Sequence, residues 1–145
     1  MTLDESQIRR YSRHILLPDM GGTGQRRLLA SAVAIDVGPG RAAEVAALAY
    51  LAAAGVGTVV VRGDVTGAVT AAEAATGILY GCGDVGRARA AAIRDRVAAI
   101  NPDVTVAERG DGAELAMSPG DDDVASALER GGVAAVQLIA RLLQA

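Results

Sequence analysis

The chain has no lysine, tryptophan or phenylalanine among its 145 residues, and aromatic residues make up only 2% of it. A core without large rings must be built from small aliphatic side chains, which favours close packing of helices on a sheet. Its 14 basic residues are all arginines and are outnumbered by 17 acidic ones, so the net charge is −3. Because no basic surface is indicated, nucleic acid is not expected as a partner.

Cys82 is the only cysteine, which excludes an internal disulfide and a multi-cysteine zinc site, and it fits a reducing cytoplasm. Charged residues at the N-terminus precede any apolar run, so a signal peptide is not expected. The longest apolar stretch, residues 45–61, is interrupted at Gly55 and Gly57. It is interpreted as a buried helix followed by a buried strand rather than a membrane span. The sequence therefore predicts a cytoplasmic protein without a membrane segment.

Apolar and β-branched runs alternate with helical patterns along the chain. Strands are predicted over 32–37, 58–62 and 104–106, and helices over 41–54, 84–100 and 124–143, the last with a break at Gly131-Gly132. This order predicts an α/β fold, a Rossmann-like three-layer unit with a short, mainly parallel sheet flanked by helices and preceded by an N-terminal helical arm. We expect a single domain, divided into an arm (1–31), a βαβ core (32–107), a linker (108–123) and a C-terminal helix (124–145).

A glycine turn, Gly38-Pro39-Gly40, follows the first strand and opens the next helix. Glycines at such a turn allow a phosphate to approach the helix N-terminus, where free N–H groups favour an anion. Pro39 has no backbone N–H to donate to a phosphate, and Arg41 places a side chain where nucleotide-binding loops usually have a glycine that leaves room for the ligand. The turn is therefore either a nucleotide-binding loop or a structural connection between strand and helix.

The second strand ends in Arg62-Gly63-Asp64. A dinucleotide-binding unit has an acidic residue at this strand end, which holds the ribose hydroxyls, and Arg62 stands in that place. An arginine there is able to accept a ribose 2′-phosphate, which keeps an NADP-binding module as a lesser alternative. The favoured interpretation is that Arg62 and Asp64 lie in solvent at the end of the strand.

Four segments share their order and spacing with one enzyme family. They are the run Arg10-Tyr11-Ser12-Arg13-His14-Ile15-Leu16-Leu17-Pro18, the pair Gly24-Gln25, the stretch from Tyr50 to Gly57 and the stretch from Asp84 to Arg89. In these segments the sequence resembles the ThiF/MoeB/HesA family, the bacterial relatives of ubiquitin-activating enzymes. The resemblance is strong from residue 10 to residue 106 and loose over the last helix.

This resemblance implies an enzyme that uses ATP and Mg²⁺ to adenylate the C-terminal glycine of a ubiquitin-like sulfur-carrier protein. Arg13 matches the family arginine that reaches the ATP phosphates of the partner subunit, so it is expected to act in trans. Arg89 stands where the family has a phosphate-contacting lysine. The nucleotide-binding residues that the resemblance and the turn together imply are Gly38, Gly40, Arg41, Asp64, Arg89 and, in trans, Arg13.

Other parts of the family's site are changed in this chain. Arg62 stands where the family has its ribose-binding aspartate, and Glu73 replaces an ATP-binding arginine and so reverses the charge. After the third strand, the family's magnesium-holding aspartates, catalytic cysteine segment and zinc-binding cysteine pairs have no counterpart. Because adenylation needs cations on the phosphates and carboxylates on Mg²⁺, the metal would rest largely on Asp64. The sequence predicts no catalytic residue and no metal site.

Two functions follow. In the first, the chain is a degenerate, non-catalytic partner that forms a homodimer, or a heterodimer with a full-length family member, in an adenylating or sulfur-carrier system. In the second, it is itself an ATP-dependent adenylyltransferase acting on a ubiquitin-like sulfur carrier. The Asp121-Asp122-Asp123 run is interpreted as a linker and helix cap rather than a cation site. An apolar face of the last helix is expected to cover the sheet or dock a partner; it comprises Val133, Val136, Ile139, Ala140 and Leu143.

Overall fold

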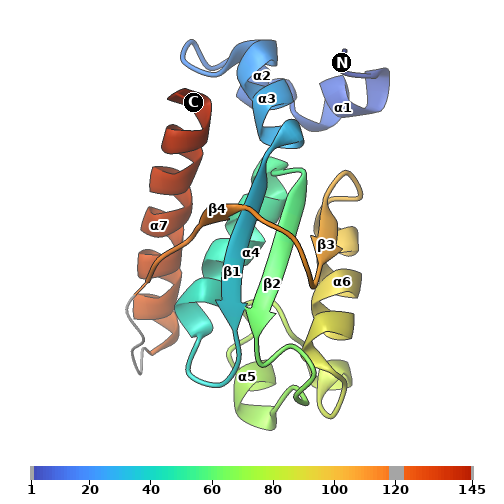
Figure 1. The fold of residues 1–145 in the computed structure, drawn as a ribbon, viewed down its shortest axis with the longest axis vertical. Coiled ribbons are helices and arrows are strands. Elements are labelled where there is room, and N and C mark those ends of the chain that lie inside the picture. Colours follow the sequence, from blue (N-terminus) through green and yellow to red (C-terminus); the bar gives the residue numbers. More distant parts are fainter. Residues whose placement is uncertain (1, 118–122, 145) are drawn as a thin grey trace.

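The fold was analysed in a computed structural model, which describes residues 2–117 and 123–144. Four parallel strands form one sheet with the spatial order β3-β2-β1-β4 (Figure 1). The strands are β1 (Ala32–Val37), β2 (Thr58–Gly63), β3 (Thr105–Ala107) and β4 (Ala113–Glu114). The helices are α1 (Glu5–Arg10), α2 (Ser12–Ile15), α3 (Gly21–Ala30), α4 (Ala42–Ala54), α5 (Ala71–Ala75), the short 3-10 helix η1 (Cys82–Asp84), α6 (Arg89–Ile100) and α7 (Val124–Gln144).

The two central strands are buried on both faces, which explains their nearly continuous runs of alanine, valine and isoleucine. Alternate side chains of β1 and β2 belong to the main apolar core: Val33, Ile35, Val37, Val59 and Val61. Ala34 and Val60 point to the opposite face and are also buried, with exposures of 1% and 2%. Something other than the core helices must therefore cover that second face.

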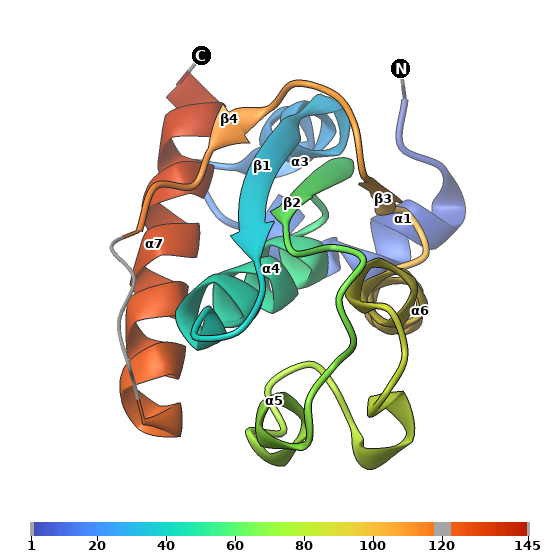
Figure 2. The same ribbon diagram turned by 60° about the horizontal axis from the view of Figure 1, so that its bottom comes forward.

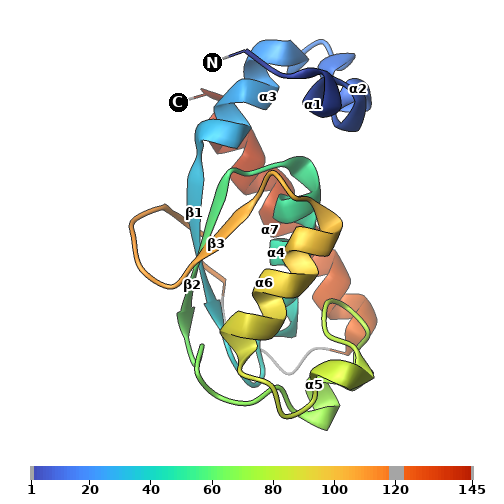
Figure 3. The same ribbon diagram turned by 90° about the vertical axis from the view of Figure 1, so that its right-hand side faces the viewer.

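A non-helical connection covers it. Figure 3 shows α4, α6 and α7 on one side of the sheet and the link from β3 to β4 on the other. A Cβ on Gly112 would lie 2.7 Å from the backbone carbonyl carbon of Val33, so only glycine allows so close an approach. Arg62 fastens the link by donating to Glu114 (2.5 Å) and to the carbonyl of Gly110 (3.2 Å). The predicted α/β Rossmann-like fold is confirmed, with helices forming one outer layer and this connection the other.

The strand order places the glycine turn at a topological switch point. β1 has β2 on one side, reached through α4, and β4 on the other, reached by the crossing link. In open α/β sheets ligands bind outside the carboxyl ends of the strands at such a point. Figure 2 looks toward this end of the sheet and shows α5 projecting beyond it.

The last helix is continuous, so the predicted break at Gly131-Gly132 is wrong. A Cβ on Gly131 would lie 2.4 Å from the carbonyl oxygen of Ala43 and 2.7 Å from the Cβ of Ala46. This glycine lets α7 pack closely against α4 and does not end a helix. The buried side of α7 consists of Ala127, Gly131, Ala135 and Leu138, whereas Val133 and Val136 of the predicted apolar face are 52% and 67% exposed.

Two further boundaries differ from the prediction. The helix predicted over 84–100 begins only at Arg89, because η1 and Gly86, with a φ of 84°, interrupt the chain before it. The short strand β4 lies within the predicted linker and pairs with β1. Asp121 and Asp122 lie outside the described residues, but Asp123 caps α7 by accepting from the Ser126 N–H at 3.0 Å. Across residues 2–117 and 123–144, no helix has the length and apolar character needed to cross a bilayer.

Candidate functional site

The glycine turn adopts the backbone conformation that its sequence predicts. Gly38 and Gly40 have φ values of 149° and 72°, in the region that favours glycine. The turn leads into α4, and the side chain of its N-cap residue, Arg41, makes no capping hydrogen bond. Arg41 instead forms a 2.7 Å ion pair with Glu44, whose side chain is only 3% exposed. The first turn of α4 therefore presents backbone N–H groups at the carboxyl end of β1.

A cavity of about 160 Å³ opens beside this turn. It is smaller than the ~300–1,000 Å³ typical of small-molecule sites, so it has room for part of a nucleotide rather than for all of one. One side of the cavity belongs to the turn and to α4, and the other to α5 and the loop that follows. The lining residues are Gly38, Gly40, Arg41, Ala42, Val45, Ala72, Glu73, Thr76 and Tyr80.

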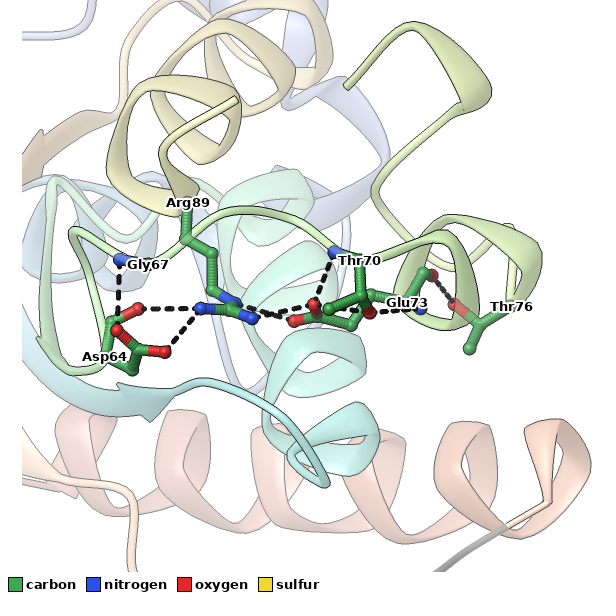
Figure 4. A network of polar contacts seen from close by, with 6 residues as sticks. All are labelled: Asp64, Gly67, Thr70, Glu73, Thr76 and Arg89. Atoms are coloured by element: carbon green, nitrogen blue, oxygen red, sulfur yellow. Dashed lines mark hydrogen bonds and ion pairs between the residues drawn. The ribbon is translucent and has the colours of Figure 1, made fainter. Parts of the chain in front are cut away.

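Arg89 is at the centre of a polar network (Figure 4), which includes Glu73, one of the residues that line this cavity. Its side chain, only 2% exposed, begins at the first residue of α6. The Nε and Nη2 atoms donate to the two carboxylate oxygens of Glu73, at 2.7 and 2.8 Å. The Nη1 atom donates to the carboxylate of Asp64 at 2.6 Å and to its carbonyl oxygen at 3.3 Å. All three guanidinium nitrogens are therefore engaged within the chain.

Glu73 is held in place from its own helix as well. It is the third residue of α5 and forms a capping box with Thr70, whose N–H and hydroxyl donate to Oε2 at 2.8 and 2.9 Å. Burial by itself raises the pKa of Glu73, but the hydrogen bonds from Arg89 and Thr70 outweigh it and keep that pKa below its usual value. The hydrogen bonds to Glu73 likewise raise the pKa of Arg89. Both groups are charged near neutral pH.

Asp64 lies at the end of β2 and is half exposed. Its Oδ1 accepts from the N–H of Gly67 at 3.0 Å while Oδ2 is bound to Arg89. Within the described parts of the chain, no three histidine, cysteine, aspartate or glutamate side chains come together as metal ligands. The residues present do not fit a preformed Mg²⁺ site, because the one carboxylate expected to hold the metal is paired with an arginine.

The structure brings Gly38, Gly40 and Arg41 to one side of the cavity, and Arg89 and Asp64 to the network beyond Glu73. Arg62 is directed elsewhere. Its guanidinium binds Glu114 and Gly110 on the sheet face opposite the helices, so this geometry gives no support to a 2′-phosphate site at Arg62.

Arg13 lies far from the glycine turn of its own chain. It belongs to α2, at the end of the sheet where the strands begin, whereas the turn lies where β1 ends (Figure 1). The neighbouring motif residues fix this arm to the domain. The Tyr11 hydroxyl donates to Asp103 and accepts from the Nδ2 of Asn101, both at 2.9 Å. Arg13 itself is exposed.

Several residues of the site were not among the predicted ones, and Glu44 and Tyr80 are two of them. Glu44 pairs with Arg41 from one turn along the same helix, a spacing that the sequence displays. Tyr80 lines the cavity and is 3% exposed, and its hydroxyl has no hydrogen-bond partner among the described residues. Burial raises the pKa of Tyr80, so its hydroxyl is protonated at neutral pH. Nothing in the sequence around Tyr80 indicates a buried, unpaired hydroxyl.

Comparison with known proteins points to one family. A family model described as "ThiF family" matches residues 11–130. A probable adenylyltransferase/sulfurtransferase, MoeZ of Mycobacterium tuberculosis, is 41% identical over 105 residues, which are 72% of this chain and 26% of MoeZ. The SAMP-activating enzyme E1 of Haloferax volcanii is 40% identical over 73% of this chain and 38% of its own length. The sulfur carrier protein ThiS adenylyltransferase of Escherichia coli K12 is 38% identical over 70% of this chain and 39% of its own length.

Solved structures show the same fold. The crystal structure of PaaA has a TM-score of 0.63 and 28% identity, covering 72% of this chain and 36% of PaaA. The E. coli tRNA N6-threonylcarbamoyladenosine dehydratase TcdA, in complex with ATP, has a TM-score of 0.58. At 16% identity over 84% of this chain and 43% of TcdA, the second likeness concerns the fold alone. Measured against the three sequence relatives above (MoeZ, the SAMP-activating enzyme E1 and the ThiS adenylyltransferase), the chain spans roughly a quarter to two-fifths of their length.

Proposed function

Because the chain belongs to the ThiF family, we propose that it acts in the ATP-dependent adenylation of the C-terminus of a ubiquitin-like sulfur-carrier protein. Three relatives support this proposal through their names, which describe an adenylyltransferase/sulfurtransferase, a SAMP-activating enzyme and a ThiS adenylyltransferase. The chain matches only part of each, so it is proposed to supply the nucleotide-binding unit of this activity.

The observation that carries the proposal is the position of the glycine turn. Gly38 and Gly40 allow a phosphate group to approach the first turn of α4, at the topological switch point of the sheet and beside a cavity. In adenylation a carboxylate attacks the α-phosphate, so the protein must hold that phosphate in place and stabilise its negative charge. In this proposal the turn orients the phosphates, Arg89 is the cation near them, and Arg13 of a second subunit adds positive charge.

A second function is favoured by the network around Arg89. Its guanidinium is bound to two carboxylates, those of Glu73 and Asp64, so this cluster carries a net negative charge. A site in this state attracts a triphosphate weakly. In the second function the chain is therefore a non-catalytic partner that forms a dimer with a full-length family member and lends it Arg13.

One experiment separates the two functions. ATP–pyrophosphate exchange is measured with a sulfur-carrier protein and this chain alone, and then with a full-length relative whose own arm arginine has been removed. Exchange by the chain alone supports adenylation. Exchange that appears only in the mixture, and disappears with Arg13→Ala, supports the partner function. Arg9→Ala is the matched control, because Arg9 lies on the same arm and forms an exposed pair with Glu5.

A further inference from the structure

We propose that Glu73 fills the anion-binding position of this site from within the chain, so that a phosphate group must displace its carboxylate to reach Arg89. The inference rests on the proposed nucleotide-binding function and names the residue that limits affinity for the ligand's phosphates. It follows from the geometry of the Glu73–Arg89 pair and from an unpaired hydroxyl beside it.

In this pair, Glu73 occupies an edge of the Arg89 guanidinium that could otherwise bind a phosphate. Both oxygens of Glu73 accept from one edge of the Arg89 guanidinium, at 2.7 and 2.8 Å. This two-point arrangement is the one that arginine offers to a carboxylate or to a phosphate alike. The Arg89 side chain is 2% exposed, so an external anion reaches this edge only after Glu73 has left it.

Tyr80 provides an independent indication of a ligand. Its side chain is almost fully buried and lines the same cavity as Glu73, yet its hydroxyl has no partner among the described residues. Buried hydroxyl groups are nearly always hydrogen-bonded in native proteins. The charges of Glu73 and Arg89 both act on the Tyr80 hydroxyl, so it lies near their ion pair. A phosphate oxygen that took the place of the Glu73 carboxylate would be a suitable acceptor for the Tyr80 proton, and a ligand would then complete a site that the chain leaves incomplete.

Glu73 is able to move without a rearrangement of the sheet. It belongs to α5, a helix of five residues that projects from the carboxyl end of the sheet (Figure 2). Its side chain is 15% exposed and borders the cavity, so rotation about its own torsions releases Arg89. A phosphate and the Glu73 carboxylate carry like charges, and they cannot share the guanidinium without strong repulsion. Displacement of Glu73 therefore lowers the affinity for every ligand that carries a phosphate.

The test compares Glu73→Gln with the wild type by calorimetric titration against ATP, inorganic pyrophosphate and adenosine. Glutamine keeps the size of the side chain and one acceptor for Arg89 but removes the charge. We expect Glu73→Gln to bind ATP and pyrophosphate at least about tenfold more tightly, and adenosine with unchanged affinity. Glu108→Gln is the matched control, because Glu108 also pairs with an arginine, Arg94, but on the surface.

Three results would overturn the proposal: equal affinities of Glu73→Gln and the wild type for pyrophosphate, an equal gain for adenosine, or a gain that persists when Arg89 is also changed to glutamine. A measurement on the wild type avoids dependence on the stability of the variants. Pyrophosphate must shift the NMR signal of the Arg89 Nε–H group, and binding without this shift contradicts displacement. A gain in Glu73→Gln without any carrier adenylation would refute the proposed function and leave this inference standing.

Discussion

Replacing Gly131 by alanine should destabilise the protein, although alanine is the better helix former. Gly131 lies in the middle of α7, where alanine is favoured over glycine by about 0.8–1.0 kcal/mol from helix propensity alone. Against this, the added Cβ would lie 2.4 Å from the carbonyl oxygen of Ala43 and 2.8 Å from the backbone nitrogen of Ala47. Backbone atoms cannot rotate away, so the two helices must separate.

Gly132, the next residue, has more room for a side chain than Gly131 does. A Cβ on Gly132 would lie 3.3 Å from the ring of Tyr50, which is 47% exposed and free to turn toward solvent. Overpacking at a rigid helix contact costs roughly 1–3 kcal/mol. Gly131→Ala is therefore expected to lose up to about 2 kcal/mol after the gain in propensity is subtracted, and Gly132→Ala to gain up to about 1 kcal/mol.

Urea denaturation followed by far-UV circular dichroism measures both changes, with equal m-values as the condition for comparing midpoints. In a protein of this size, each kcal/mol corresponds to a shift of roughly 2–4 °C in Tm. If Gly131→Ala proved as stable as Gly132→Ala, the close contact between α4 and α7 would not be the reason for Gly131. The interpretation of α7 as a helix packed through its glycine would then be wrong.

Three other changes test the arm and the polar contacts. Tyr11→Phe removes the hydroxyl that joins Asn101 and Asp103, and it should lower the free energy of unfolding by about 1–2 kcal/mol, whereas the half-exposed Tyr50→Phe should not. In the folded state the pKa of Asp84 lies below its ordinary value of 3.8. The largest cause is the hydrogen bond from the N–H of Gly81, and the side chains of Arg96 and Arg87 lower the pKa further by donating to the same carboxylate. The stability from this contact is present above about pH 4 and is lost as the pH falls through the folded pKa. When the free energy of unfolding is measured at decreasing pH, it should therefore fall less steeply for Asp84→Asn than for the wild type. Equal slopes for the two proteins would contradict this. Arg13→Ala should leave the free energy of unfolding unchanged within about 0.5 kcal/mol, because its side chain is exposed and forms no hydrogen bond or ion pair within residues 2–117 and 123–144. A larger loss on denaturation would show that Arg13 has a structural role.

The elements with strong patterns could be predicted from the sequence. Apolar runs bounded by glycine or proline indicated strands at 32–37 and 58–62, and the structure has them at Ala32–Val37 and Thr58–Gly63. The break predicted at Gly131-Gly132 was wrong because tertiary packing against α4 outweighs the low helix propensity of glycine. The strand β4 has only two residues, too few for any periodic pattern, and exists because β1 offers it an edge.

Only part of the candidate site could be predicted from the sequence. The glycine turn follows from its own residues, since Gly38 and Gly40 have the backbone angles that favour glycine. The sequence also indicated that Glu73 reverses a charge. It did not indicate that Glu73 binds both edge nitrogens of Arg89, because the two residues are sixteen positions apart and meet only through the fold of the segment after β2.

The length of one helix limits how Arg13 can act. The arm is fastened at the C-terminal end of α4, where Asn101 and Gln25 donate to the carbonyls of Ala52 and Ala54. The glycine turn lies at the other end of α4, and thirteen residues at about 1.5 Å each separate the two ends by roughly 20 Å. No arginine side chain spans that distance. A role for Arg13 in nucleotide chemistry therefore requires the glycine turn of a second subunit, and loss of activity in Arg13→Ala should be restored by mixing with a subunit whose arginine is intact but whose turn is disabled.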